Sequence, residues 1–208
     1  QVKIGEGRFS KVYKIVEKGS EKVYAAKISK TELNDEDKPY VTHLKSEIKT
    51  ISELNHPSLL KYFGFSPVNF DQKSYPTIIT EFESNGSLEE ILNNERQKNS
   101  PSDSPWNDTK KLINIYGIAS GMSILHDREI IHRDLKPSNI LEDDYLFPKI
   151  ADFGLTKSDK NLTKSSEEKN IYMPPENWNN NEYSKPGDVY AFSIIVYEIL
   201  TLEEPFKN

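Results

Sequence analysis

The feature that most constrains this chain is a polar run set between apolar segments in its middle. Residues 131–141 read Ile-His-Arg-Asp-Leu-Lys-Pro-Ser-Asn-Ile-Leu. The run holds an acid, a base and an amide, Asp134, Lys136 and Asn139, at fixed offsets in a predicted loop. A second run, residues 150–154, reads Ile-Ala-Asp-Phe-Gly and adds another acid. We expect these two segments to carry the chemistry of the protein.

A glycine-rich segment near the N-terminus is the second signal. Residues 5–12 read Gly-Glu-Gly-Arg-Phe-Ser-Lys-Val, and two glycines between strands let backbone N–H groups approach an anion. A hairpin without a ligand is the alternative for this segment. The next predicted strand holds Lys27, which either extends to solvent or binds phosphate oxygens if the helical acid Glu47 fixes it.

The hydrophobic pattern changes from strand-like to helical along the chain. Alternation predicts strands before the Asn-Gly-Ser turn signal at residues 85–87, with one helix among them, and helical spacing dominates after it. A stretch rich in Asn, Ser, Pro and charge reads as a loop insertion at residues 93–109. The predicted strands are 11–16, 22–28, 59–65 and 77–82, and the predicted helices are 43–54, 112–125 and 189–200.

Composition excludes several classes of function. The 208 residues carry 27 basic and 33 acidic side chains, a net charge of −6, which gives no overall attraction to nucleic acid. The absence of cysteine rules out disulfides, thiolate zinc sites and a cysteine nucleophile, and it fits a reducing compartment. The longest apolar stretch, residues 191–200, is too short and too polar for a membrane helix. Both ends read as cuts in a longer protein.

In their order and context, these motifs resemble those of eukaryotic protein kinases of the Ser/Thr type. Softer features, such as Gly-Met at residues 121–122, resemble the tyrosine-kinase-like group. The resemblance implies an α+β, protein-kinase-like bilobal fold. A small N-lobe, residues 1–83, holds an antiparallel sheet and one helix. A mainly helical, incomplete C-lobe follows at residues 84–208, with an activation segment at 152–176.

The resemblance also implies roles for the motif residues. Asp134 would receive or orient the substrate hydroxyl, Lys136 would neutralise the transferring phosphate, and Lys27, held by Glu47, would bind the α- and β-phosphates of ATP. Oxygen ligands for Mg²⁺ would come from Asn139 and Asp152. The remaining nucleotide-binding residues would cover the phosphates, enclose the adenine or form the hinge: Ile4, Gly5, Gly7, Val12, Ala25, Thr80, Glu81, Glu83 and Leu141.

A regulatory phosphosite is implied within the activation segment. Ser165 lies at the family's usual phosphorylation position, and Thr163 and Ser166 are its neighbours. A phosphate there would face basic side chains and order the loop. The alternative is a solvated loop that is never modified. The basic side chains are those of Arg133, Lys157 and His43.

The same resemblance assigns structural roles. It stacks Ile51, Tyr62, His132 and Phe153 across the lobes and makes Asp188 the anchor of the catalytic-loop backbone. Two departures count against turnover. Lys169 replaces a Thr that hydrogen-bonds the catalytic residues, and the chain stops before the remaining C-lobe helices.

The leading function is an ATP- and Mg²⁺-dependent protein serine/threonine kinase. Its partners would be protein substrates and an upstream activating kinase, with no nucleic acid and no membrane segment, in the cytoplasm. The alternative from another class is a pseudokinase, a nucleotide-binding scaffold acting through protein contacts. A small-molecule kinase ranks third.

Overall fold

The computed structural model describes residues 1–7, 10–34, 48–49, 51–98, 104–153, 171–177 and 183–206. The chain divides into two compact units, each with its own buried core. The first unit comprises Gln1–Asn55 and Leu60–Phe82, and the second comprises His56–Leu59 and Glu83–Asn208. The architecture is α+β, as the sequence predicts.

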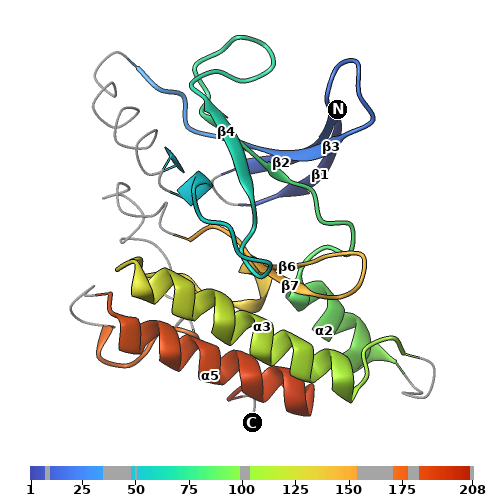
Figure 1. The fold of residues 1–208 in the computed structure, drawn as a ribbon, viewed down its shortest axis with the longest axis vertical. Coiled ribbons are helices and arrows are strands. Elements are labelled where there is room, and N and C mark those ends of the chain that lie inside the picture. The colour runs from blue at the N-terminus through green and yellow to red at the C-terminus, as the bar shows by residue number, and fades with distance from the viewer. Residues whose placement is uncertain are drawn as a thin grey trace. The chain divides into compact units, whose positions relative to one another are not determined.

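An antiparallel five-stranded sheet forms the first unit, with the strand order β1-β2-β3-β5-β4 (Figure 1). Gly19, with φ +86°, makes the turn between β2 and β3, a conformation that glycine adopts without strain. The strands are β1 Val2–Glu6, β2 Ser10–Val16, β3 Val23–Ser29, β4 Tyr62–Ser66 and β5 Thr77–Glu81.

The predicted strands are confirmed in the sheet, with one difference at β4. The apolar run that predicts a strand from residue 59 does not start pairing there, because Pro57 holds a turn in which the Leu59 N–H donates to the His56 carbonyl. Leu59 makes only an isolated bridge to Ile150, and pairing with β5 begins at Tyr62. Helical geometry is seen at residues 48–49 and 51–52, inside the predicted helix, whose other residues before 51 lie outside the described ranges.

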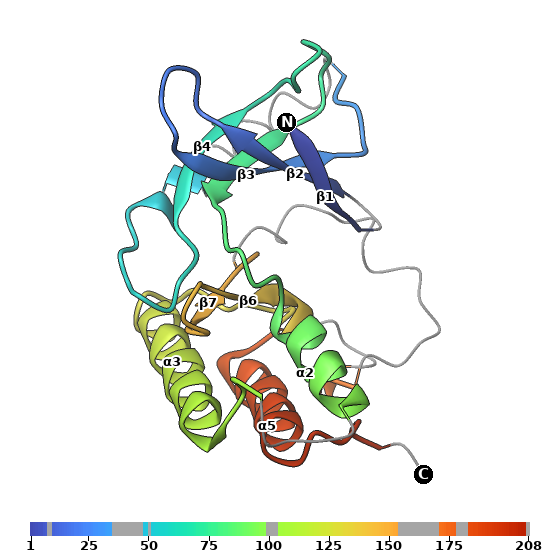
Figure 2. The same ribbon diagram turned by 90° about the vertical axis from the view of Figure 1, so that its right-hand side faces the viewer.

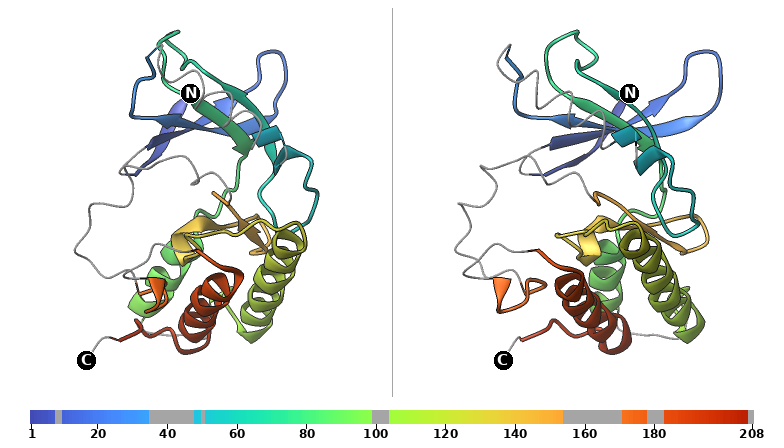
Figure 3. Two further views of the ribbon diagram at one scale, coloured as in Figure 1. Left: turned by 90° about the vertical axis from the view of Figure 1, so that its left-hand side faces the viewer. Right: turned by 60° about the vertical axis from the view of Figure 1, so that its left-hand side comes forward.

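In the described part of the second unit, helices α2, α3 and α5 and the 3₁₀ helix η3 accompany a short β-hairpin (Figure 2). Helices α3 and α5 lie side by side, and the hairpin of β6 and β7 packs on α3, as both views of Figure 3 show. Helix α2 contacts β6 and the 3₁₀ helix η3. The elements are α2 Leu88–Gln97, α3 Asp108–Asp127, η3 Pro137–Asn139, β6 Ile140–Glu142, β7 Pro148–Ile150 and α5 Lys185–Thr201.

Helix ends follow from capping residues in the sequence. The side chains of Asn107 and Ser184 accept backbone hydrogen bonds at the starts of α3 and α5, which extends both helices beyond the predicted apolar spans. Ser87 and Glu90 form a capping box that starts α2. The predicted loop at residues 93–109 is therefore wrong at its ends, because α2 continues to Gln97 and α3 begins at Asp108.

Apolar side chains of α5 point both into the core and outward. Ala191, Ile195 and Ile199 are buried, while Val189 and Leu200 remain exposed. In the part of the chain that the structure describes, no helix combines the length and apolar character needed to cross a membrane.

Candidate functional site

The sheet register in the first unit places the predicted nucleotide-binding residues on one face. Val12 of β2 pairs with Gly5 of β1 on one side and with Lys27 of β3 on the other. Ala25 of β3 pairs with Thr80 of β5 and lies two residues from Lys27. Because side chains two residues apart on a strand point to the same face, Val12, Ala25, Lys27 and Thr80 share one face.

A hydrogen bond joins the ends of β1 and β2 at the glycine-rich segment. The Gly7 N–H donates to the Ser10 carbonyl at 2.9 Å. Ile4 is exposed on the edge strand β1. Glu47, the predicted partner of Lys27, lies outside the described residues, so the pairing of the two stays a prediction.

Residues 81–83 connect the sheet to the second unit, and hydrogen bonds fix the backbone at Glu81. The Glu81 N–H donates to the Lys61 carbonyl at 2.9 Å, and the Glu81 carboxylate accepts from the Lys61 N–H at 2.7 Å. The Thr80 hydroxyl donates to the Glu81 carbonyl at 3.0 Å. Glu83, half-buried, is the first residue of the second unit's longer segment. The end of β5 is thus rigid where the predicted hinge begins.

In the second unit, the structure brings together the three polar residues of the central loop. The Lys136 ammonium lies 2.8 Å from the Asp134 carboxylate. The Asn139 amide nitrogen donates to the backbone carbonyl of Asp134 at 2.7 Å and to its carboxylate at 3.1 Å. The Asp134 side chain keeps 38% of its surface exposed, so its carboxylate can meet a substrate.

Asp188, near the start of α5, fixes the backbone of this loop. Its carboxylate accepts hydrogen bonds from the N–H groups of His132, at 2.8 Å, and Arg133, at 3.0 Å. The ring of His126 on α3 adds a third contact at 2.9 Å. Asp188 itself is only 4% exposed. The predicted anchoring role of Asp188 is confirmed, whereas His126 as its third partner was not predicted.

His132 connects the loop to the segment that carries Asp152. The ring is fully buried, and burial lowers its pKa, so it is neutral near pH 7. Its Nε2 lies 3.0 Å from the Ala151 carbonyl, which can only accept, and its Nδ1 lies 3.4 Å from the Asp134 N–H. One tautomer, with the proton on Nε2, satisfies both contacts. The ring centroid of Phe153 lies 6.5 Å away.

The β6–β7 hairpin brings Asn139 and Asp152 to the same end. Ile140 pairs with Ile150, and the Ala151 N–H donates to the Asn139 carbonyl at 2.8 Å. Asp152 follows directly and adopts φ +59°, a left-handed conformation that is strained for a residue with a side chain. Arg133 is also left-handed, at φ +75°. Such strain concentrates at functional sites because surrounding contacts must enforce it.

The donor atoms at this end of the hairpin fit a hard divalent cation. The Asn139 amide nitrogen donates to Asp134, which leaves its Oδ1 as an oxygen ligand, and Asp152 at the same end of the hairpin carries a carboxylate. Two protein oxygens suit Mg²⁺, which commonly takes its other ligands from water and phosphates. Within the described ranges, no group of three or more His, Cys, Asp or Glu residues forms a complete metal site of its own.

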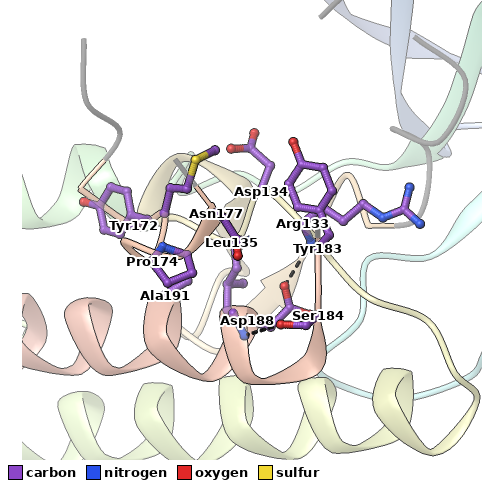
Figure 4. A pocket seen from close by; sticks show the side chains of 12 residues that line it. Arg133, Asp134, Leu135, Tyr172, Pro174, Asn177, Tyr183, Ser184, Asp188 and Ala191 are labelled. Carbon is purple, nitrogen blue, oxygen red and sulfur yellow. Dashed lines mark hydrogen bonds between the residues drawn. The ribbon is translucent and has the colours of Figure 1, made fainter. Parts of the chain in front are cut away.

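A small pocket lies beside Asp134 (Figure 4). Its aromatic and apolar side chains come from the catalytic loop, from the end of the activation segment and from the start of α5. The guanidinium of Arg133 lies 5.8 Å from the ring centroid of Tyr183. Tyr183 lies directly before Ser184, which caps α5, and this position is the sequence signal that could have predicted its place in the pocket lining. The main lining residues are Asp134, Leu135, Tyr172, Met173, Pro174, Asn177, Tyr183 and Ala191.

The remaining predicted residues divide into two groups. Leu141, on β6, is half-buried and forms a bridge with Ser87 in the second unit. Several predicted regulatory residues, and the departure Lys169, lie outside the described residues, so their predictions are untested. These are His43, Lys157, Thr163, Ser165, Ser166 and Lys169.

Comparison with known proteins decides the family. The family model described as the protein kinase domain matches residues 1–208. The chain belongs to the protein kinase domain family. A probable serine/threonine-protein kinase of Dictyostelium discoideum is 34% identical over 99% of this kinase domain, and a dual specificity protein kinase of that organism, shkB, is 34% identical over 100%. A G-type lectin S-receptor-like serine/threonine-protein kinase of Arabidopsis thaliana is 34% identical over 97%.

These relatives are much longer than the matched kinase domain. The alignment covers 15% of the first Dictyostelium protein, 31% of shkB and 23% of the Arabidopsis protein. The similarity is thus to their kinase domains.

Proposed function

We propose that this kinase domain transfers the γ-phosphoryl group of ATP to serine and threonine hydroxyls of proteins. The observation that carries the proposal is the joint placement of Asp134, Lys136 and Asn139, on a loop backbone anchored by the buried Asp188. The serine/threonine names of two of the relatives support the acceptor class.

The chemistry assigned to the loop is proton handling and charge neutralisation. The substrate oxygen forms a bond to the γ-phosphorus while the bond from that phosphorus to the β–γ bridging oxygen breaks, and ADP leaves. The hydroxyl proton passes to the Asp134 carboxylate, which Asn139 orients. The Lys136 ammonium, 2.8 Å from that carboxylate, offsets the charge of the transferring group.

ATP binding is assigned to the shared face of the first unit's sheet and to the end of β5. Val12, Ala25 and Lys27 face the same side as Thr80, and Gly5 and Gly7 would let the backbone approach the phosphates. Mg²⁺, held by Asn139 and Asp152, would neutralise phosphate charge.

Regulation and partners belong to the same proposal. A phosphate on Ser165, or on Thr163 or Ser166, would pair with Arg133, Lys157 and His43, and an upstream kinase would add it. The buried Arg133 Nε–H donates to no partner among the described residues, which leaves it available for an anion. A cytoplasmic location likewise remains a prediction.

The test is transfer of labelled phosphate from ATP to peptide libraries with a fixed Ser, Thr or Tyr. We expect transfer to Ser and Thr, loss of about 10²- to 10⁴-fold in Asp134→Asn because proton transfer is removed, and loss in Lys27→Met. Wild-type rates no higher than those of Asp134→Asn would contradict the proposal and favour a pseudokinase.

A further inference from the structure

An acidic side chain lies inside the segment that is proposed to approach the phosphates of ATP. Glu6 stands between Gly5 and Gly7, where a carboxylate would repel the nucleotide if it lay on the nucleotide-binding face of the sheet. Nothing in the proposed phosphoryl transfer uses this charge. The direction of the Glu6 side chain therefore decides whether the acid hinders or helps nucleotide binding.

The register of β1 and β2 turns Glu6 away from the nucleotide-binding face. Gly5 pairs with Val12 of β2, and Glu6 pairs with Lys11. Paired residues share a face of the sheet and successive residues alternate between faces. Glu6 therefore lies on the face opposite Val12 and Lys27, which is the back face of the sheet.

A β-bulge in β1 places Lys3 on the same back face. On a regular strand, residues three apart would point to opposite faces. The register shifts between Lys3 and Gly5, so that Lys3 pairs with Tyr13 and Glu6 pairs with Lys11, which are two residues apart on β2. The bulge therefore brings Lys3 and Glu6 to one face, where their side chains form an ion pair.

Lys30 reaches the same carboxylate from the end of β3. Its ammonium lies 2.7 Å from Glu6 Oε1, while Lys3 contacts Oε2, so each oxygen of the acid has its own cation. Strand β2 lies between β1 and β3 (Figure 2), so the contact with Lys30 crosses a whole strand. Hydrogen bonds from Lys3 and Lys30 lower the pKa of Glu6 to about 2, which keeps the carboxylate ionised near neutral pH.

We propose that Lys3, Glu6 and Lys30 form an ionic strap across the back face, which holds the glycine-rich segment in position for the nucleotide phosphates. The inference rests on the proposed function, because it requires ATP to bind at this segment. The three residues lie on the face away from the nucleotide, so they are positioning residues. Their side chains keep between 33% and 47% of their surfaces exposed, so salt should weaken the strap.

The first test measures the release of a fluorescent, unreactive ATP analogue with Mg²⁺ by stopped flow. Lys30→Met and Glu6→Gln should each speed release about two- to fivefold, as expected for an exposed ion pair. Lys30→Arg keeps the cation and should restore the wild-type rate. The matched control is Lys22→Met, which removes a cation directly before the other end of β3 and should leave release unchanged.

The direction of the Glu6→Gln effect separates the strap from direct phosphate binding by Lys30. If Lys30 bound the phosphates itself, removal of the competing acid would slow release, whereas loss of either partner of a strap speeds it. The double variant Glu6→Gln/Lys30→Met should release the analogue no faster than Glu6→Gln, because both changes break the same contact. Slower release from Glu6→Gln, or single effects that multiply in the double variant, would overturn the proposal.

Salt and the two KM values give readouts that a change in stability alone would not move. In about 1 M KCl, where charges are screened beyond about 3 Å, the release rates of Lys30→Met and the wild type should converge. In the transfer assay, Lys30→Met should raise the KM for ATP about two- to fivefold and change the peptide KM less than about twofold.

The outcomes distinguish the strap from the proposed function. Equal release rates for the wild type, Lys30→Met and Glu6→Gln at low salt would contradict the strap. Strap-dependent release without any phosphate transfer would contradict only the proposed function. Failure of the wild type to bind the analogue at all would contradict both.

Discussion

Two buried acids of the second unit have opposite hydrogen-bonding surroundings. Asp188 accepts two backbone N–H groups and contacts the His126 ring. Glu142 is fully buried, and neither of its oxygens accepts a hydrogen bond from any described residue. Burial raises the pKa of Glu142 to about 8. Glu142 is therefore mainly a neutral acid at pH 7.

Asn114 on α3 interacts with the Glu142 carboxyl and lowers its pKa, in the opposite sense to burial. The Asn114 amide nitrogen donates to the Lys110 and Leu146 carbonyls, and its buried Oδ1 has no donor among the described residues. The nearby charges act in opposite senses, since Asp143 and Glu83 raise the pKa of Glu142 while Lys110 lowers it.

At the residue scale, we predict that Glu142→Gln removes one pH dependence of stability. An unfolded Glu ionises near pH 4.5, but the folded state keeps the proton until about pH 8. Folding thus binds a proton between those values, and the wild-type free energy of unfolding should fall, relative to the variant, by about 1.4 kcal/mol per pH unit as pH rises. Urea unfolding of both proteins from pH 5 to pH 9 measures the difference. Parallel curves would show that Glu142 is already ionised in the folded state.

At the scale of elements, the spacing between α3 and the β6–β7 hairpin depends on two glycines. A Cβ on Gly117 would lie 2.6 Å from a Pro148 ring carbon, and one on Gly121 would lie 2.8 Å from the Ile150 side chain. Both are closer than atoms normally approach. The hairpin can lie this near the helix only because both side chains are absent, and the hairpin also carries Asn139 and Asp152 at its end.

We predict that Gly117→Ala destabilises the second unit although alanine is the better helix former. The helical preference is worth about 1 kcal/mol, whereas overpacking costs about 1–3 kcal/mol, so the net loss should be up to about 2 kcal/mol. Gly64→Ala is the control, because a Cβ there meets nothing within 4 Å. Chemical denaturation measures both. A Gly117→Ala protein more stable than the wild type would mean that the hairpin shifts freely.

Periodicity predicted the element types well and their ends less well. Alternation identified β2, β3 and β5, and helical spacing identified α3 and α5. The first turns of those helices were missed because they are polar and depend on caps rather than on an apolar face. The short helix α2 was obscured because its second half is Asn, Glu, Arg and Gln, and its Ser87–Glu90 capping box went unused as a signal.

At the scale of the whole molecule, we predict that an unreactive ATP analogue with Mg²⁺ stabilises the protein against unfolding. A ligand that binds only the folded state adds about 2.7 kcal/mol at one hundred times its dissociation constant. Lys27→Met and Asp152→Asn should each reduce the shift at a fixed analogue concentration, and omitting Mg²⁺ should affect the wild type more than Asp152→Asn. Thermal unfolding in the presence and absence of the analogue measures the shift in unfolding temperature for each protein. A shift equal in all three proteins would contradict the assigned site.

The motifs predicted which catalytic residues lie together, but not the contacts that hold those residues in place. Asp134, Lys136 and Asn139 could be chosen from the sequence because their types and order match a known reaction. The contacts of Asp188 with His126, and of Glu198 with Arg96 and Tyr172, join residues far apart in the chain. Local patterns carry no trace of such pairs, and only the anchoring role of Asp188 was implied by the family resemblance.

The anchoring of the central loop by Asp188 has a consequence for biosynthesis. Translation delivers residues 132–139 well before the acid that restrains their backbone. A nascent chain that has emerged only as far as the β6–β7 hairpin lacks this restraint, whatever else has already folded. The catalytic loop should therefore reach its restrained conformation late in translation, once α5 has emerged. A partly made polypeptide should not phosphorylate neighbouring proteins before that point.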